Sequence, residues 1–258
     1  KIISRERSYH GVTVAAASLT GLPVTQNHFD LPVDALGILR TDHPHYYRGK
    51  QGDESEAEFV DRIVGNLEAM IVREGPDTIA AFIAEPITGA SGVIVPPADY
   101  YQKVQAVLNR YNIMFWADEV ITGFGRTGSD FGCNTMGIES PDMMTFAKQL
   151  SSAYMPISAS AVRREMYDAM IEQTATAGAF GHGYTYSGHP VACAVALKVL
   201  EIYQRDSVFE KAAVTGQYMQ KRLAEFTDHP LVGEVRGSGL LGAIELVANK
   251  ETGEPFVG

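Results

Sequence analysis

Apolar residues recur at intervals of three and four through residues 54–75, where Phe59, Ile63, Leu67 and Ile71 are separated by polar positions. This spacing predicts an amphipathic helix, and the acidic residues near its start favour a helix N-terminus there. Residues 99–111, 189–206 and 209–226 are also expected to be helical, the second of these ranges with Pro190 in its first turn.

Short apolar runs alternate with these helices. Residues 77–86, 112–118 and 142–148 are predicted to form buried strands, and the order strand, helix, strand favours an α/β fold with a largely parallel sheet. Residues 232–247 contain two apolar runs broken by glycine, which is typical of antiparallel strands. We therefore expect a large domain over residues 1–230 and the start of a small C-terminal α+β domain over residues 231–258.

Composition and charge exclude several classes of partner. The 258 residues carry a formal net charge of -10 without a basic cluster, which argues against nucleic acid and anionic membrane as partners. The longest strongly apolar run, residues 191–200, is too short to span a bilayer. Cys133 and Cys193 lack metal-ligand spacing, so we predict no metal site and interpret both as thiols of a reducing compartment, the cytoplasm.

Three polar residues stand at or just after the ends of predicted strands: Glu85, Asp118 and Lys148. Parallel α/β sheets bind ligands at the carboxyl ends of their strands. Asp118 and Lys148 could form a simple salt bridge at the sheet edge. They could also serve pyridoxal phosphate chemistry, in which a lysine holds the cofactor aldehyde as a Schiff base and a carboxylate holds the ring nitrogen protonated.

The glycines that follow Asp118 offer a competing interpretation. Gly123, Gly125 and Gly128 spell G-x-G-x-x-G, a pattern associated with dinucleotide binding. In that fold the first glycine directly follows a strand and the third opens a helix. Here two acidic residues end the strand instead, and residues 129–140 lack helical periodicity. We therefore expect the glycines to allow tight turns beside a site.

Six blocks in order resemble the class III pyridoxal-phosphate-dependent aminotransferases: "SYHGVT", "FIAEPITGASGVIVPP", "WADEVITGFGRTG", "DMMTFAKQLSSAYMPISA", "HGYTYSGHPVACAVALKVLE" and "EVRGSGLLGAIEL". The resemblance implies the aspartate-aminotransferase fold, with a mostly parallel, seven-stranded sheet flanked by helices. It also implies pyridoxal 5'-phosphate as cofactor, with Lys148 as the Schiff-base lysine and Asp118 as the partner of the ring nitrogen.

The same resemblance assigns further cofactor-binding residues. Val120 and Tyr9 would cover the two faces of the ring, and Glu85 would lie near the lysine. Thr185 would reach the cofactor phosphate of a neighbouring subunit, which implies a homodimer with shared active sites. His10 is expected only to orient Tyr9 or the backbone. Arg126 and Arg236 match family positions that brace loops.

Two residues of this chain indicate which branch of the family it resembles. Members that act on ornithine or 4-aminobutyrate resemble one another in having a glutamate where this chain has Ala90 and a glutamine where it has Ile121. The resemblance then favours the branch that transfers an amino group from an ω-amino acid or amine to pyruvate. Its partners would be small-molecule amines and keto acids.

Parts of the family pattern fall outside this sequence, namely the upstream Gly/Ser-rich phosphate turn and the C-terminal arginine that binds the substrate carboxylate. We therefore expect the central part of a longer enzyme, with little activity alone. The alternatives are a class III decarboxylase or aminomutase, and a non-catalytic remnant lacking the phosphate-binding turn. A nicotinamide oxidoreductase is more distant, and its marker would be a helix that starts at Gly128.

Overall fold

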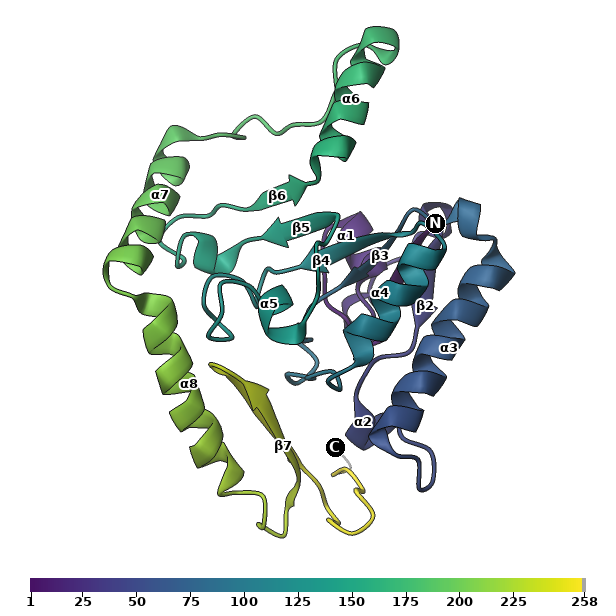
Figure 1. Cartoon of the computed structure of the whole chain (residues 1–258), viewed down its shortest axis with the longest axis vertical. Helices are drawn as coiled ribbons and strands as arrows, with labels where there is room; N and C mark the ends of the chain where they lie inside the picture. Colours follow the sequence, from purple (N-terminus) through teal and green to yellow (C-terminus); the bar gives the residue numbers. More distant parts are fainter. Residues whose placement is uncertain (257–258) are drawn as a thin grey trace.

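A twisted six-stranded sheet forms the centre of the molecule, and helices flank it (Figure 1). The computed structural model describes residues 1–256. The strand order is β2-β1-β3-β4-β5-β6, in which all neighbours are parallel except the antiparallel pair β5 and β6. The sheet strands are β1 (Ile2–Arg5), β2 (Ile38–Thr41), β3 (Ala81–Ala84), β4 (Met114–Asp118), β5 (Met143–Phe146) and β6 (Ala159–Val162).

The predicted fold class is confirmed, with one difference in strand number. The resemblance implied seven strands, whereas the sheet has six within residues 1–256. β6 is an edge strand of this sheet. In the part of the chain that the structure describes, it pairs with β5 alone.

Eight α-helices are present in the described residues. They are α1 (Val14–Leu19), α2 (Tyr46–Gly49), α3 (Glu56–Glu74), α4 (Tyr100–Arg110), α5 (Gly132–Met136), α6 (Arg164–Ala177), α7 (Pro190–Arg205) and α8 (Val208–Ala224). The ends of α3 follow from its sequence. The Ser55 side chain accepts from the Glu58 backbone N–H while the Glu58 carboxylate accepts from the Ser55 N–H, and Gly75 follows the last turn with a φ of +83°.

The main core lies between the sheet and the pair α3 and α4, which pack against each other (Figure 1). The apolar face predicted for α3 is buried, with Phe59 and Ile71 1 % and 0 % exposed. It meets the apolar side chains of the central strands, including Phe82 of β3 and Phe115 of β4, whose ring centroids lie 5.8 Å apart. This packing holds the ends of β3, β4 and β5 in place.

The C-terminal part of the chain is a hairpin packed along a helix. β7 (Val232–Ser238) and β8 (Leu241–Leu246) pair antiparallel, as their glycine-broken pattern predicted, and both contact α8. The boundary near residue 230 that divides residues 1–230 from residues 231–258 stays a prediction. Residues 257–258 of the second range lie outside the described residues.

The loop after β4 contains no helix that begins at Gly128. A five-residue helix, α5, begins at Gly132 instead. Gly125 and Gly128 have φ angles of +85° and +88°, in the left-handed region that favours glycine. The marker of a nicotinamide site is therefore missing from this described loop, and the glycines form turns.

Candidate active site

The ends of three parallel strands bring the predicted residues to one edge of the sheet. Ala84 of β3 is paired with Ala117 of β4, and Asp118 with Thr145 of β5. Glu85 follows β3 directly, and Lys148 comes two residues after β5. They line a cavity of about 80 Å³, whose walls are Tyr9, His10, Gly11, Glu85, Asp118, Val120, Ile121 and Lys148. Five of the six predicted site residues thus share one cavity.

Asp118 is buried and held on both carboxylate oxygens. Its residue surface is 6 % exposed, and its Oδ1 accepts a hydrogen bond from the Val120 backbone N–H at 3.1 Å. Its Oδ2 lies 2.8 Å from Nδ1 of His10, a side chain that is 2 % exposed. An ionised Asp118 requires the ring proton on Nδ1, because a carboxylate can only accept. The arrangement presents a fixed negative group to the cavity.

His10 makes a contact in the candidate site that sequence reasoning missed. It was expected to orient Tyr9 or the backbone, yet its ring contacts the carboxylate of Asp118, 108 residues away. Its Nε2 is buried without a hydrogen-bond partner. No local spacing signals this contact, since it depends on how β1 and β4 are placed in the sheet. The only available signal was the position of His10 directly after Tyr9.

Glu85 holds the segment that carries Tyr9. Its side chain is buried, and its two carboxylate oxygens accept from the backbone N–H groups of Tyr9 and Gly89, each at 2.9 Å. Burial raises the pKa of Glu85, while the neighbouring His10 and the two backbone N–H groups oppose that rise. Glu85 therefore lines the cavity, and its hydrogen bonds join the backbone of Tyr9 to the loop after β3.

The two acidic residues at the end of β4, Asp118 and Glu119, make different contacts. Asp118 lines the cavity, whereas Glu119 points into the loop and is 1 % exposed. The Glu119 carboxylate accepts from the backbone N–H groups of Gly132 and Cys133 at 2.9 and 2.7 Å. It therefore satisfies the free N–H groups at the start of α5. Burial, and then the Glu119 charge, raise the pKa of Cys133, which makes this thiol a poor nucleophile.

Lys148 stands in a strained turn at the cavity. Its side chain is exposed, and its φ of +38° falls in the left-handed region, which is uncommon for a residue with a Cβ. A short 3₁₀ turn, Lys148–Leu150, begins at this residue. Left-handed backbone conformations of non-glycine residues are found most often at functional sites.

Thr185 lies outside the cavity, in the exposed segment 179–188. The role predicted for it requires a second subunit, so its contact with a cofactor phosphate stays a prediction. Cys133 and Cys193 are both free cysteines, as expected. No helix of the described residues is long and apolar enough to cross a membrane.

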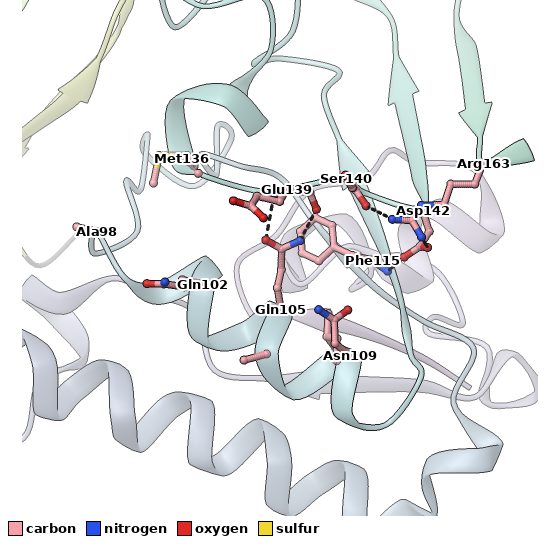
Figure 2. A pocket seen from close by; sticks show the side chains of 13 residues that line it. Ala98, Gln102, Gln105, Asn109, Phe115, Met136, Glu139, Ser140, Asp142 and Arg163 are labelled. Atoms are coloured by element: carbon pink, nitrogen blue, oxygen red, sulfur yellow. Dashed lines mark hydrogen bonds and ion pairs between the residues drawn. The ribbon is translucent and has the colours of Figure 1, made fainter.

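A larger cavity, of about 560 Å³, lies at the amino ends of β4 and β5, opposite the ends that carry Asp118 and Lys148. Figure 2 shows the side chains that line it. Phe115 near the start of β4 and Asp142 just before β5 line it. Its polar groups are largely paired: Arg163 contacts Asp142 at 3.0 Å, and the Gln105 amide exchanges hydrogen bonds with the backbone of Glu139. We favour the smaller cavity as the site because it holds a buried carboxylate and a lysine that face the same space.

One cluster of histidine and acidic side chains has the closeness of a metal site: His45, Glu234 and Glu245. Two arginines already neutralise it, since Arg236 contacts both carboxylates and Arg48 Nε contacts Glu245 at 2.6 Å. We therefore interpret this cluster as an ion-pair network that ties the β7–β8 hairpin to the region of α2.

Comparison with protein-family models matches residues 1–257 to the model described as "Aminotransferase class-III". The chain is 51 % identical over 256 residues to gamma aminobutyrate transaminase 3, chloroplastic, of Solanum lycopersicum, covering 99 % of this chain and 49 % of that protein. It is 48 % identical over 256 residues to vanillin aminotransferase of Capsicum chinense, covering 99 % of this chain and 55 % of that protein. The chain thus spans about half the length of the curated relatives it matches.

Solved structures give the same picture. The omega transaminase from Pseudomonas jessenii in complex with PMP superposes with a TM-score of 0.97 at 52 % identity, covering 100 % of this chain and 56 % of that one. A structure described as a transaminase with L-ala superposes with a TM-score of 0.96 at 54 % identity, covering 99 % and 60 %.

Proposed function

Because this chain belongs to the class III aminotransferases, we propose that it forms the cofactor-binding part of a pyridoxal-phosphate-dependent transaminase. One observation carries this proposal: Asp118 and Lys148, from the ends of neighbouring parallel strands, line one cavity. A salt bridge at the sheet edge was the simpler alternative. No ion pair joins Asp118 and Lys148 among the described residues, and Asp118 is paired with His10 instead.

The residues of the cavity fit pyridoxal 5'-phosphate. Asp118 offers a buried anion for the ring nitrogen, and Lys148 offers the amine that bonds to the aldehyde carbon. Tyr9 and Val120, which also line the cavity, would pack on the faces of the ring. Thr185 of a second copy would supply a hydroxyl for the phosphate.

The chemistry that this cofactor supplies when bound is that of an electron sink for the carbanion left by proton loss. Asp118 would keep a proton on the ring nitrogen, because its ionised carboxylate is an acceptor at the base of the cavity. The hydrogen bond from His10 Nδ1 would hold that carboxylate in orientation. In the first half-reaction the Lys148 amine would take the proton from the donor carbon that bears the amino group, and in the second it would deliver a proton to the carbonyl carbon of the acceptor.

For the substrates, we propose an ω-amino acid or amine as donor and pyruvate as acceptor. Support comes from Ala90 and Ile121, the two positions that depart from the ornithine and 4-aminobutyrate pattern, and Ile121 lines the cavity. The Solanum lycopersicum relative is named for 4-aminobutyrate, itself an ω-amino acid, so this compound belongs among the donors to be tested. The homologous transaminase structures favour amino transfer over a decarboxylase or aminomutase.

We further propose a homodimer in a reducing, aqueous compartment. The exposed segment that carries Thr185 supports the dimer, because it is free to approach a second copy. Cys133 and Cys193, which form no disulfide, support a reducing compartment such as the cytoplasm. The names of plant relatives add chloroplast and mitochondrion to the locations that cell fractionation should compare.

The cofactor test uses protein extended to the length of its relatives. Pyridoxal phosphate should give a visible absorbance band, and borohydride reduction should fix the cofactor to the peptide that contains Lys148. Lys148→Ala should abolish both, while Lys198→Ala, which removes an exposed lysine of α7, should abolish neither. A cofactor attached at another lysine would refute the proposal. Alanine formed from pyruvate, rather than released carbon dioxide, would separate transamination from decarboxylation.

A further inference from the structure

The backbone of residues 148–155, here called the lysine turn, is unusual in holding three non-glycine residues in the left-handed region. Lys148, Ser152 and Ala153 have φ angles of +38°, +52° and +64°. Such conformations persist only where surrounding contacts determine them. The contacts that hold this turn therefore fix the position of the Lys148 backbone, from which its side chain extends.

The first of these contacts comes from α7, which packs against the start of the turn. The Tyr203 hydroxyl donates to the backbone carbonyl of Gln149 at 2.8 Å and lies 3.0 Å from the Ser152 hydroxyl. The Tyr203 ring is itself packed against Phe209, with a centroid separation of 5.4 Å. Tyr203 thus bridges two residues of the turn from a rigid helix.

The second contact comes from the loop that follows Asp118. With the Gln149 side-chain amide turned so that its oxygen faces Arg126, that oxygen accepts from the guanidinium Nε at 3.0 Å and Nη2 at 2.6 Å. Arg126 is itself fixed by its backbone carbonyl, which accepts from the Leu240 N–H at 3.0 Å. Within the described residues Arg126 forms no ion pair, so its charge is directed at this amide. The loop after Asp118 is thereby tied to the residue beside Lys148.

We propose that Arg126, Gln149 and Tyr203 are positioning residues that set the place of the Lys148 amine relative to Asp118. The inference rests on the proposed function, since it gives these side chains a role in cofactor attachment and proton transfer. The reason is geometric: a displacement of about 1 Å between reacting groups can cost about a hundredfold in rate. None of these three residues lines the cavity that holds Asp118 and Lys148, so they would act through Lys148.

The first experiment measures the turn itself, without the cofactor. In cofactor-free protein, amide hydrogen exchange is followed in a peptide covering residues 148–155, whose N–H groups of Leu150, Ser151 and Tyr154 are hydrogen-bonded. Tyr203→Phe should speed this exchange about fivefold, the effect of one ordinary hydrogen bond. Exchange in β4 should stay unchanged. The control Tyr218→Phe removes the hydroxyl of an exposed tyrosine on α8. Equal exchange in the two variants would overturn the role of Tyr203.

The second experiment uses the loaded protein and a conservative rescue. Gln149→Leu removes the acceptor for Arg126, whereas Gln149→Glu keeps an oxygen there whichever way the side chain turns. We expect Gln149→Leu to lower kcat about tenfold with KM changed less than about twofold. Gln149→Glu should recover most of the loss. Equal kcat in these variants, or a loss confined to KM, would overturn the role of the Arg126–Gln149 contact.

The two proposals fail in different ways. If the unmodified protein does not attach the cofactor at Lys148, the proposed function is wrong, whatever the exchange data show. If attachment occurs but Tyr203→Phe and Gln149→Leu leave exchange and kcat unchanged, the positioning role is wrong and the proposed function stands.

Discussion

The Nδ1 atom of His10 lies 2.8 Å from the Oδ2 atom of Asp118, although 108 residues separate them in the sequence. Both side chains are nearly inaccessible to solvent, at 2 % and 7 % exposure. A hydrogen bond to a buried carboxylate is stronger than one between neutral groups. Asp118 is therefore held by a side chain in addition to the backbone N–H of Val120.

Replacing His10 should weaken the function of Asp118. His10→Phe keeps a ring but removes the donor, and we expect kcat/KM to fall about tenfold to a hundredfold, the range for a hydrogen bond to a charged group. His10→Asn can place an amide N–H near the position of Nδ1, so it should retain most of the activity. Steady-state kinetics and cofactor titration by absorbance measure both effects. Activity that is retained in His10→Phe and lost in His10→Asn would show that the ring, not the donor, matters.

Replacing Glu119 should affect stability more than chemistry. Glu119→Ala leaves the N–H groups of Gly132 and Cys133 without a partner, and each unsatisfied buried donor costs about 1–3 kcal/mol. We expect urea denaturation to show about 3 kcal/mol less unfolding free energy. The control Glu139→Ala removes an exposed side chain and should change it by less than about 0.5 kcal/mol.

Asp118→Asn, at the residue before Glu119, should instead affect the chemistry more than the stability. It should abolish most turnover and leave the unfolding free energy close to that of the unmodified protein, because the amide is nearly isosteric with the carboxylate. If Asp118→Asn destabilised the fold as much as Glu119→Ala, the division of roles within the acidic pair would be wrong.

Strong local patterns predicted much of the fold. Residues 54–75 were expected to be helical, and α3 runs from Glu56 to Glu74 because Ser55 caps its start and Gly75 follows its end. The hairpin at residues 232–247 and the strands β3, β4 and β5 also follow their apolar runs. In each case the signal lies within the element itself.

The elements that were missed lack such a signal. β1 and β2 have only four residues each, and they are strands because distant residues pair with them. The β6 sequence, ASAV, is largely exposed, and α6 buries no residue. The candidate site follows the same rule. The strand-end pattern predicted that Asp118 and Lys148 meet, and they line one cavity, whereas the His10 contact depends on tertiary placement.

We expect position 125 to accept only glycine, because its backbone is in the left-handed region and a side chain there would have no room. Its φ is +85°, and a Cβ there would lie 2.3 Å from Cδ1 of Phe209. Gly125→Ala should therefore cost about 2–3 kcal/mol of unfolding free energy. In the matched control Gly183→Ala, a Cβ has nothing within 4 Å, and the change should stay within about 0.5 kcal/mol. Similar unfolding curves for both variants would contradict a structural role for this glycine.

The buried carboxyl group of Glu85 should give stability a pH dependence of definite sign. Burial raises its pKa in the folded protein above the ordinary value of 4.5, so the folded state binds the proton more tightly than the unfolded state does. The stability that Glu85 contributes is then fully present below about pH 4.5 and is lost as pH rises through the folded-state pKa.

Glu85→Gln isolates this effect, because glutamine does not titrate in this range. The unfolding free energy of the unmodified protein minus that of Glu85→Gln should fall as pH rises from about 4 to about 8. Urea denaturation at several pH values measures the difference, and other carboxyl groups cancel because both proteins contain them. A difference that rises with pH would mean that the N–H groups of Tyr9 and Gly89 outweigh burial and favour the ionised form.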